Sequence, residues 1–276
     1  MIFPGDELAG SDSERSTQEV LARRVSGLAI VAYPEEFKSW DAIGYKAIEV
    51  YNVYTDARRI NPLVMFFDGL WSYRSYPDLL FATFYERPAA GLKKWDQAII
   101  HTNEKLVATA GNDSHANIGI SLNDSSGKTL LGFKLDPYER SFRLVHLHVL
   151  VGSTPAAKLN EESLLGAISA GNCFIGFDLF GDTTGFRFMA IDGDEKRIMG
   201  EEIKLRDAVT LSVRVPVPAR VVLLKDGATI EEQKEVRQME FVAKEKGSYR
   251  VEVYLPQLPG PVGNQPWIIS NPIYVR

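Results

Sequence analysis

The sequence predicts an α/β domain in residues 1–184, followed by an all-β, immunoglobulin-like sandwich in residues 185–276. In the first part, apolar segments typical of buried strands alternate with helical patterns, which indicates parallel βα units. In the second part, apolar and polar residues alternate and Asp-Gly pairs separate the segments, which is typical of antiparallel hairpins. A chain of 276 residues is long enough for both domains.

The first part begins with a short strand, predicted in residues 1–8. Ser16 and Glu19 then form a capping-box pattern, which starts a helix that ends at Val25. The expected strands that follow are 27–34, 47–52 and 105–113, and the expected helices are 37–43 and much of 56–103. Several βα units in a row indicate either a barrel or a doubly wound parallel sheet.

The end of the first part contains strands and one clear helix. Residues 118–158 have strand-like patterns. Asn160 is a typical N-cap residue and Gly171 is a typical residue just past a helix end, so a helix is expected between them. The single cysteine, Cys173, lies in an apolar segment and is most simply a small core residue.

The second part consists of alternating segments and tight turns. Asp192-Gly193 and Asp226-Gly227 predict hairpin turns. Four aliphatic residues at alternate positions predict one buried face of a strand: Val209, Leu211, Val213 and Val215. Since no helical pattern follows residue 184, this part is predicted to be a β-sandwich.

The composition excludes several classes of protein. A net charge of −5 gives no indication of a nucleic-acid-binding surface, and one cysteine cannot form an internal disulfide or a multi-cysteine zinc site. The N-terminal segment lacks the basic and apolar regions of a signal peptide, and every apolar run is far shorter than the ~20 residues that span a bilayer. We therefore expect a cytoplasmic protein that binds neither nucleic acid nor membranes.

Two of the four histidines, His146 and His148, form an H-x-H pattern on a predicted strand. Their side chains share one face of the strand and could chelate a metal ion. No carboxylate lies close to them in the sequence, so a packed or solvated strand face is the favoured interpretation. His101 lies near a predicted helix end and is interpreted as a surface or capping residue.

Asp113 and His115 directly follow a buried strand, within the segment TAGNDSHAN (109–117). In α/β folds, the C-terminal ends of the strands carry the ligand site. A carboxylate oxygen and an imidazole nitrogen suit Zn²⁺, Mn²⁺ or Fe²⁺. The sequence thus predicts part of a divalent-metal site at this strand end.

These segments and several others resemble the polymerase and histidinol phosphatase (PHP) superfamily, in its carbaryl-hydrolase-like branch. GNDSHA looks like the last metal-binding motif of the family, and three earlier segments are similar to its strands in the same order. A C-terminal β module of this branch is similar to the end of the chain. The matching segments are FPGDE (3–7), GLAIVAYP (27–34), AIEVYN (47–52), WDQAI (95–99), LLKDG (223–227), GSYRVEVYL (247–255) and PWIISNPIYVR (266–276).

The resemblance implies a fold, an activity and a set of ligands. The fold would be a distorted (β/α)7 barrel that holds two or three divalent metal ions and hydrolyses small phosphoesters or related esters. Glu7, Asp113 and His115 are the metal ligands that it implies in this chain. Water activated by a divalent metal ion would be the nucleophile.

The chain departs from the family pattern at two places. Neither the opening H-x-H strand of the family nor its further Asp-His motif has a counterpart in this chain. In addition, Tyr33 stands where the family has the histidine of the Ala-His-Pro strand. We therefore expect an incomplete barrel, whose open edge a partner or a second copy would cover, unless Met1 is not the native start. The expected function is a PHP-like metal-dependent phosphoesterase with an incomplete metal site. The alternative is an inactive, PHP-derived binding or scaffold protein.

Overall fold

The computed structural model describes residues 16–22, 27–53, 85–114, 119–124, 126, 128–134, 138–152, 159–258, 260 and 262–276. The helices in these ranges are α1 (Thr17–Ala22), α5 (Ala89–Thr102), α6 (Tyr138–Leu144), α7 (Glu161–Ala170) and the short 3-10 helices η2 (Asp178–Phe180) and η3 (Val262–Asn264). The strands up to residue 176 are β1 (Ile30–Val31), β2 (Ala47–Asn52), β3 (Val107–Gly111), β4 (Gly119–Asn123), β5 (Thr129–Lys134), β6 (His146–Val149) and β7 (Cys173–Gly176). The later strands are β8 (Arg187–Asp192), β9 (Glu195–Ile198), β10 (Glu202–Ile203), β11 (Val209–Lys225), β12 (Ala228–Ala243), β13 (Gly247–Tyr254), β14 (Pro266–Ser270) and β15 (Ile273–Val275).

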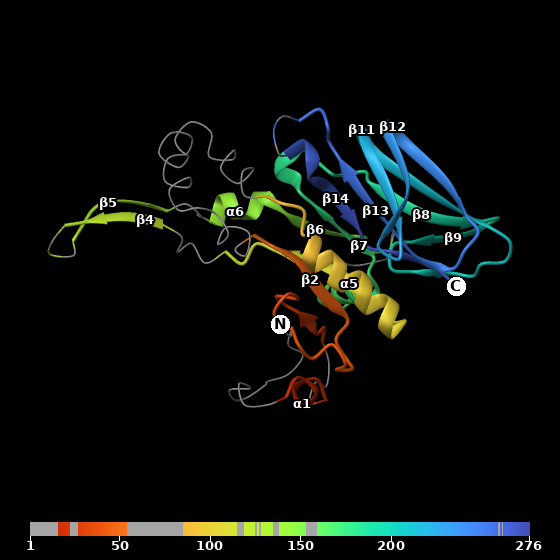
Figure 1. Ribbon diagram of the computed structural model, residues 1–276, viewed down its shortest axis with the longest axis horizontal. Helices are drawn as coiled ribbons and strands as arrows, with labels where there is room; N and C mark the ends of the chain where they lie inside the picture. The colour runs from red at the N-terminus through yellow and green to blue at the C-terminus, as the bar shows by residue number, and fades with distance from the viewer. Residues whose placement is uncertain are drawn as a thin grey trace.

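Three strands from the first part of the chain form a small parallel sheet in the order β1-β2-β3. Helix α5 lies against β2 (Figure 1). Gly91 permits this close approach, because a Cβ at this position would collide with the carbonyl oxygen of Val50. Trp95 of the same helix is fully buried in the core beneath it. These elements have the parallel βα arrangement that the sequence predicts.

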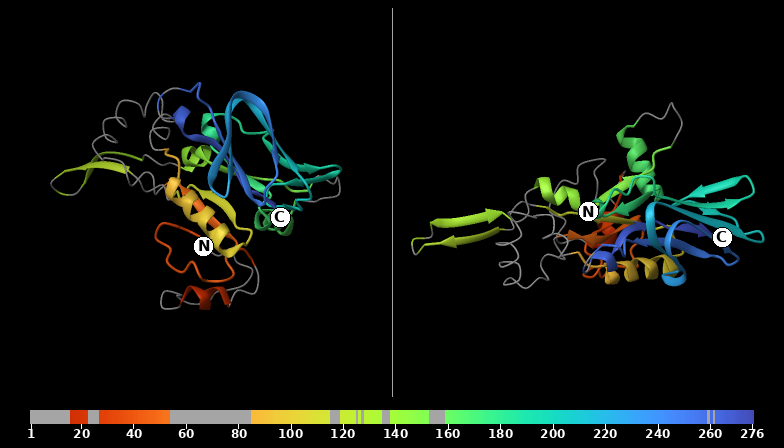
Figure 2. Two further views of the ribbon diagram at one scale, coloured as in Figure 1. Left: turned by 45° about the vertical axis from the view of Figure 1, so that its right-hand side comes forward. Right: turned by 90° about the horizontal axis from the view of Figure 1, so that it is seen from above.

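A larger, curled sheet of ten strands forms the rest of the core (Figures 1 and 2). Its main path is β6-β7-β14-β13-β11-β8-β9, and every neighbouring pair on this path is antiparallel. Strand β12 pairs with β11, and β15 pairs with β13 and, in parallel, with β10. The two hairpin turns predicted at Asp192-Gly193 and Asp226-Gly227 join β8 to β9 and β11 to β12.

The predicted (β/α)7 barrel and the predicted two-sheet sandwich are both wrong, because the protein is mostly β and its largest unit is one curled antiparallel half-barrel. Helix α7 connects β6 to β7, but these two strands pair antiparallel rather than as a βαβ unit. Strand β11 runs through both halves of the large sheet, and its pairing with β12 shifts register between Arg214 and Ala219. Pro216 and Pro218 lie in this interval and cannot donate ladder hydrogen bonds, which favours a bend.

Strands β6 and β7 also bear on the predicted domain division at residue 184. They come from the predicted first domain, yet they belong to the same sheet as the C-terminal strands through the pairing of β7 with β14. The large sheet is therefore continuous across residue 184, and the division into 1–184 and 185–276 stays a prediction.

The helix predictions have mixed outcomes. Helix α1 begins with the expected capping box, in which the Glu19 backbone N–H donates to Ser16 Oγ and Ser16 N–H donates to Glu19. Helix α7 has Asn160 as its N-cap. The helix predicted at 37–43 is wrong, because this segment forms turns around an edge-to-face aromatic group of Phe37, Trp40 and Tyr45.

The strand-like region 118–158 is only partly extended. Strands β4 and β5 form a hairpin that projects away from the two sheets (Figures 1 and 2), and helix α6 then interrupts the extended pattern. The strand predicted at 1–8 and the helical segment predicted within 56–84 lie outside the described residues. In the described part of the chain, every helix is too short or too polar to cross a membrane.

Buried polar contacts connect the two sheets. Asn271, which follows β14, is fully buried; its Oδ1 accepts a hydrogen bond from the Ala108 backbone N–H (2.7 Å), and its Nδ2 donates to the carbonyl oxygens of Ala108 (3.1 Å) and Cys173 (3.0 Å). Leu106 N–H donates to the hydroxyl oxygen of Tyr274 (3.1 Å). The small parallel sheet is thus attached to the large sheet along β3.

Candidate functional site

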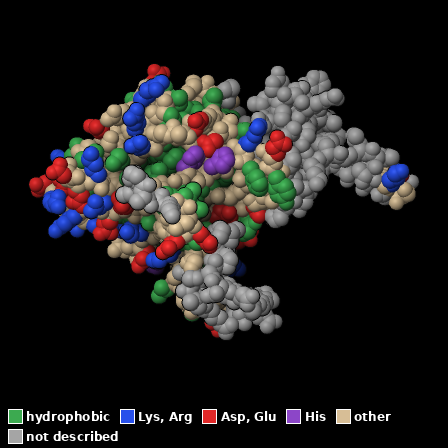
Figure 3. Space-filling view, turned by 180° about the vertical axis from the view of Figure 1, so that it is seen from behind, with side chains coloured by type: hydrophobic (Ala, Val, Ile, Leu, Met, Phe, Trp, Pro, Cys, Tyr) green, Lys and Arg blue, Asp and Glu red, His purple; other side chains and the backbone are tan. Residues whose placement is uncertain are grey.

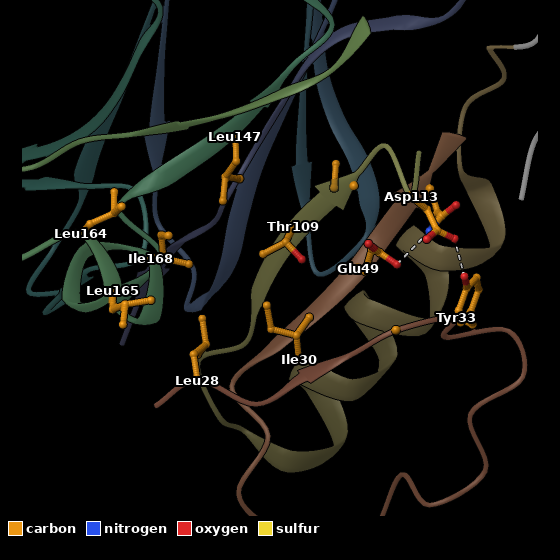
Figure 4. A pocket seen from close by; sticks show the side chains of 14 residues that line it. Leu28, Ile30, Tyr33, Glu49, Thr109, Asp113, Leu147, Leu164, Leu165 and Ile168 are labelled. Atoms are coloured by element: carbon orange, nitrogen blue, oxygen red, sulfur yellow. Dashed lines mark hydrogen bonds between the residues drawn. The ribbon is translucent and has the colours of Figure 1, made fainter. Parts of the chain in front are cut away.

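A cavity of about 380 Å³ lies along the small sheet and reaches the place where its strands end. Most of its wall is apolar and comes from the beginning of the small sheet, from β6 and from α7. Leu147, Leu164 and Ile168 contribute to this wall (Figure 4). The opposite end of the cavity is polar and carries Tyr33, Glu49 and Asp113.

Hydrogen bonds organise the polar end. The Tyr33 hydroxyl donates to Asp113 Oδ2 at 2.5 Å, and the Asn52 amide donates to Glu49 Oε2 at 3.1 Å (Figure 4). Each carboxylate therefore has a neighbour that restricts its orientation. The two acidic side chains belong to different strand segments but face the same cavity.

The parallel pairing of β2 with β3 explains this proximity. Glu49 is in register with Thr109, and Asn52 is in register with Gly111, two residues before Asp113. A Cβ at Gly111 would collide with Glu49 Oε1, so glycine leaves the space that the Glu49 carboxylate occupies. The register of β2 and β3 thus places the carboxylate of Glu49 beside Gly111, close to the strand end that Asp113 follows.

Two residues of the polar end have left-handed backbone conformations. Tyr33 has a φ of 51° and Asp113 has a φ of 46°. Aspartate tolerates this region, whereas it costs a bulky residue such as tyrosine about 1–3 kcal/mol. Such strain concentrates at functional sites, and here both residues are joined by the hydrogen bond between Tyr33 and Asp113.

The electrostatic environment changes the ionisation of Glu49. Burial is the main cause that raises the pKa of its carboxyl group; the hydrogen bond from Asn52 lowers this pKa in part, and the charge of Asp113 raises it. Glu49 therefore keeps its proton to a higher pH than an ordinary glutamate does. A carboxyl group of this kind suits proton transfer.

Of the three predicted metal ligands, the structure places one. Asp113 lies at the cavity, at the C-terminal end of β3, as the position of its segment predicts. Glu7 and His115 lie outside the described residues, so their convergence with Asp113 stays a prediction. Tyr33, the residue at the position of the family histidine, lines the same cavity.

Glu49 is not among the functional residues that the sequence predicts. A signal for it was present, because Glu49 is the single charged residue in AIEVYN, a segment that predicts a buried strand. A carboxylate in such a segment is costly unless it has a partner or a chemical role.

His146 and His148 have a carboxylate neighbour in the folded protein, although none lies close to them in the sequence. Asp178, which lies in η2 after β7, is 2.7 Å from a ring nitrogen of each histidine. The carboxylate is thus close in space although it is distant in sequence. The sequence carries no signal for this contact, because α7 separates the two strands that create it.

Cys173 is a core residue, as predicted. It is fully buried, and burial raises the pKa of its thiol to about 12, with a small opposing effect from Asn271. A thiol with so high a pKa is not a nucleophile near neutral pH.

Comparison with known proteins adds no relative. No family model, no curated protein and no solved structure matches this chain. The resemblance to the PHP superfamily therefore stays a prediction that depends on the order of the motifs.

Proposed function

We propose that this chain hydrolyses small phosphoesters with the help of a divalent metal ion, at the polar end of the cavity. The main support is that Asp113, which follows the end of β3, and Glu49 of β2 face one cavity beside the edge where parallel strands end. Ligand sites of parallel sheets lie at this edge. The PHP-like motifs lead to the same strand ends.

The donors of the polar end fit a hard divalent cation. Besides burial, the Asp113 charge raises the pKa of Glu49, so a cation between the two carboxylates would relieve an unfavourable interaction. The carboxylate oxygens of Asp113, with Glu7 and the imidazole of His115 if they converge there, are donors for Mn²⁺, Fe²⁺ or Zn²⁺. Once bound, the ion would supply Lewis acidity toward the ester.

The residues of the chain would have separate roles. Tyr33 holds one oxygen of Asp113 in place through its hydroxyl group. Glu49, with its raised pKa, would accept or donate a proton near the reacting ester. The apolar wall formed by Leu147, Leu164 and Ile168 would receive an apolar group of the substrate, which favours aryl or alkyl phosphoesters.

A non-catalytic binding protein is the second candidate function, and Tyr33 is the observation that favours it. A neutral phenol is a poor metal ligand because its ordinary pKa is about 10. In that case the cavity would bind an apolar acid or ester without turnover.

An assay of aryl phosphate hydrolysis distinguishes the two functions. We expect the full chain to hydrolyse p-nitrophenyl phosphate when Mn²⁺ is added. Glu49→Gln should lower kcat by about 10²-fold, the usual contribution of a general acid or base. Asp113→Asn and His115→Ala should each raise the Mn²⁺ concentration needed for half-maximal activity.

Matched controls are Glu104→Gln and Asp207→Asn, which change exposed carboxylates that do not line the cavity. Both should retain native activity. Absence of turnover with Mn²⁺, Zn²⁺ and Fe²⁺ would contradict the enzyme and leave the binding protein. Turnover that survives Asp113→Asn unchanged would contradict this location of the active site.

A further inference from the structure

A second group of metal-ligating side chains lies on the other side of β6 from the cavity. Successive residues of a strand face opposite sides, so Leu147 lines the cavity while His146 and His148 face away from it. Asp178 reaches the two histidines from η2, directly after β7. We call His146, His148 and Asp178 the histidine cluster.

The donor atoms of the histidine cluster converge. Asp178 Oδ2 is 2.7 Å from His146 Nδ1 and 2.7 Å from His148 Nε2, and all three donor atoms lie within 4.8 Å of one another. A tetrahedral metal ion with bonds of about 2.0–2.1 Å needs donors about 3.3 Å apart. Asp178 Oδ2 is closer than this to both ring nitrogens, so the side chains would move apart to admit the ion.

Neighbouring groups hold two of the three ligands in orientation. Thr183 donates to Asp178 Oδ1 through its backbone N–H (3.1 Å) and its hydroxyl group (2.5 Å), which leaves Oδ2 directed at the histidines. The His148 ring stacks on Phe174, with ring centres 4.7 Å apart and nearly parallel planes. Partners of this kind orient the ligands of protein metal sites.

Space for the histidine cluster depends on Gly176. This residue is in register with His146 on β6, and a Cβ there would lie 2.6 Å from Thr183 Oγ1 and 2.9 Å from His148 Nε2. Any other residue would displace these side chains. Figure 3 shows histidine side chains beside acidic ones on the surface seen from behind, and the His146 side chain is 47% exposed, so an ion can enter from solvent.

We propose that the histidine cluster binds one divalent transition-metal ion, zinc in the first instance, as a site separate from the cavity. Two imidazoles and one carboxylate are ligands typical of zinc sites. The two nitrogen donors disfavour Mg²⁺ and Ca²⁺, which prefer oxygen donors. Three protein ligands leave a coordination position open toward solvent, as in zinc sites that bind water or a substrate oxygen.

Titration of the chelator-treated full chain with Zn²⁺, followed by equilibrium dialysis and metal analysis, tests this site. Co²⁺ serves as a second probe, because its visible absorption reports histidine ligation. We expect one equivalent that His146→Ala and Asp178→Asn abolish, and that excess Mg²⁺ does not displace. Thr183→Val should weaken binding about 10–100-fold, because it removes a hydroxyl that orients Asp178.

The controls separate this site from the cavity and from misfolding. His101→Ala, which removes an exposed histidine of α5, should bind Zn²⁺ as the native chain does. The same titration in Asp113→Asn should keep the equivalent of Zn²⁺ that depends on His146.

Zn²⁺ should also raise the Tm of the native chain but not that of His146→Ala, a half-exposed position that tolerates substitution. Binding that is unchanged in His146→Ala and Asp178→Asn, or no Zn²⁺ equivalent in the native chain, would overturn the site and leave a hydrogen-bonded network.

Discussion

Glu49 opposes folding near neutral pH, because burial disfavours the charged form of its carboxyl group. Its pKa is raised mainly by burial, so the folded protein resists ionising it more than the unfolded chain does. The contribution of Glu49 to stability is therefore fully present below the unfolded pKa of about 4.5 and is lost as the pH rises through the folded pKa. We expect Glu49→Gln, which stays neutral, to be more stable than the native chain at pH 7, as measured by the midpoint of urea unfolding.

The difference in stability should shrink as the pH falls toward 4, where the native glutamate is protonated as well. Glu104→Gln is the control, because Glu104 is exposed and pairs with Lys46 at 3.4 Å, a surface contact of little energetic value. A Glu49→Gln protein that is less stable at pH 7, or equally stable at every pH, would mean that the carboxylate is well compensated in the fold. Higher stability with lower kcat would be the trade-off expected of a functional residue.

The contrast between Asp113 and Asp178 marks how far single residues can be assigned from the sequence. Asp113 was predicted because it follows a buried strand directly, and that is a local feature of the chain. Asp178 follows a strand too, but it contacts His146 and His148, which lie on the neighbouring strand β6. Local patterns place a side chain at a strand end; only the pairing of strands says which other side chains it meets.

Helix α5 is attached to the large sheet by buried charges. Arg250 of β13 donates to both oxygens of Asp96 on α5 (3.0 and 2.9 Å) and to Glu252 (2.6 Å), and Arg87, just before α5, donates to Glu252 through Nε (2.8 Å). Burial alone would raise the pKa of Glu252, but the hydrogen bond from Arg87 and the charge of Arg250 outweigh it and lower this pKa to about 2. Each charge is thus compensated by its neighbours.

The lowered pKa of Glu252 predicts how acid acts on this attachment. A folded pKa below the unfolded one contributes stability that is present above pH 4.5 and is lost as the pH falls through about 2. Glu252→Gln should cost about 3–5 kcal/mol at pH 7, because it removes the buried carboxylate charge that Arg250 and Arg87 share. The free energy of unfolding of this variant should also depend less on pH between 4.5 and 2, as urea titrations at several pH values would measure.

Glu245→Gln is the matched control for Glu252→Gln. Glu245 also pairs with a cation, Lys225, but it is exposed, so its removal should change the free energy of unfolding little. Equal effects of the two substitutions would contradict a special role for the buried network.

The strands themselves were largely predictable, whereas their partners were not. The alternating aliphatic residues from Val209 to Val215 are buried on one face of β11, as their spacing predicts. The sequence does not say that β11 continues past Pro216 and Pro218 and pairs with β8, β12 and β13. Pairing partners depend on long-range contacts, and a strand–helix–strand pattern reads alike for parallel and antiparallel neighbours.

In the whole molecule, both candidate sites lie near the boundary between the two sheets. The cavity is formed by the strand ends of the small sheet with β6 and α7, and the histidine cluster is formed by β6 and β7 of the large sheet. A sequence-based division at residue 184 separates hairpin patterns from helical ones, but it cannot detect that β7 pairs with β14. Both sites thus depend on how the small sheet is joined to the large one.

Asn271 provides a test of that junction. Asn271→Ala removes the hydrogen-bond partners of the Ala108 N–H and of the Ala108 and Cys173 carbonyl groups. Each buried group left without a partner costs about 1–3 kcal/mol. Because these groups join β3 to the large sheet, we expect peptides from β2 and β3 to exchange amide hydrogens much faster in the variant, while peptides from β11 and β13 remain protected.

Hydrogen-exchange mass spectrometry measures the exchange of both groups of peptides. Asn264→Ala, at an exposed asparagine of η3, is the control that should leave the exchange of all these peptides unchanged. Equal acceleration in both groups of peptides would mean that the two sheets unfold as a single cooperative unit, and native protection of β3 would mean that other contacts hold the junction.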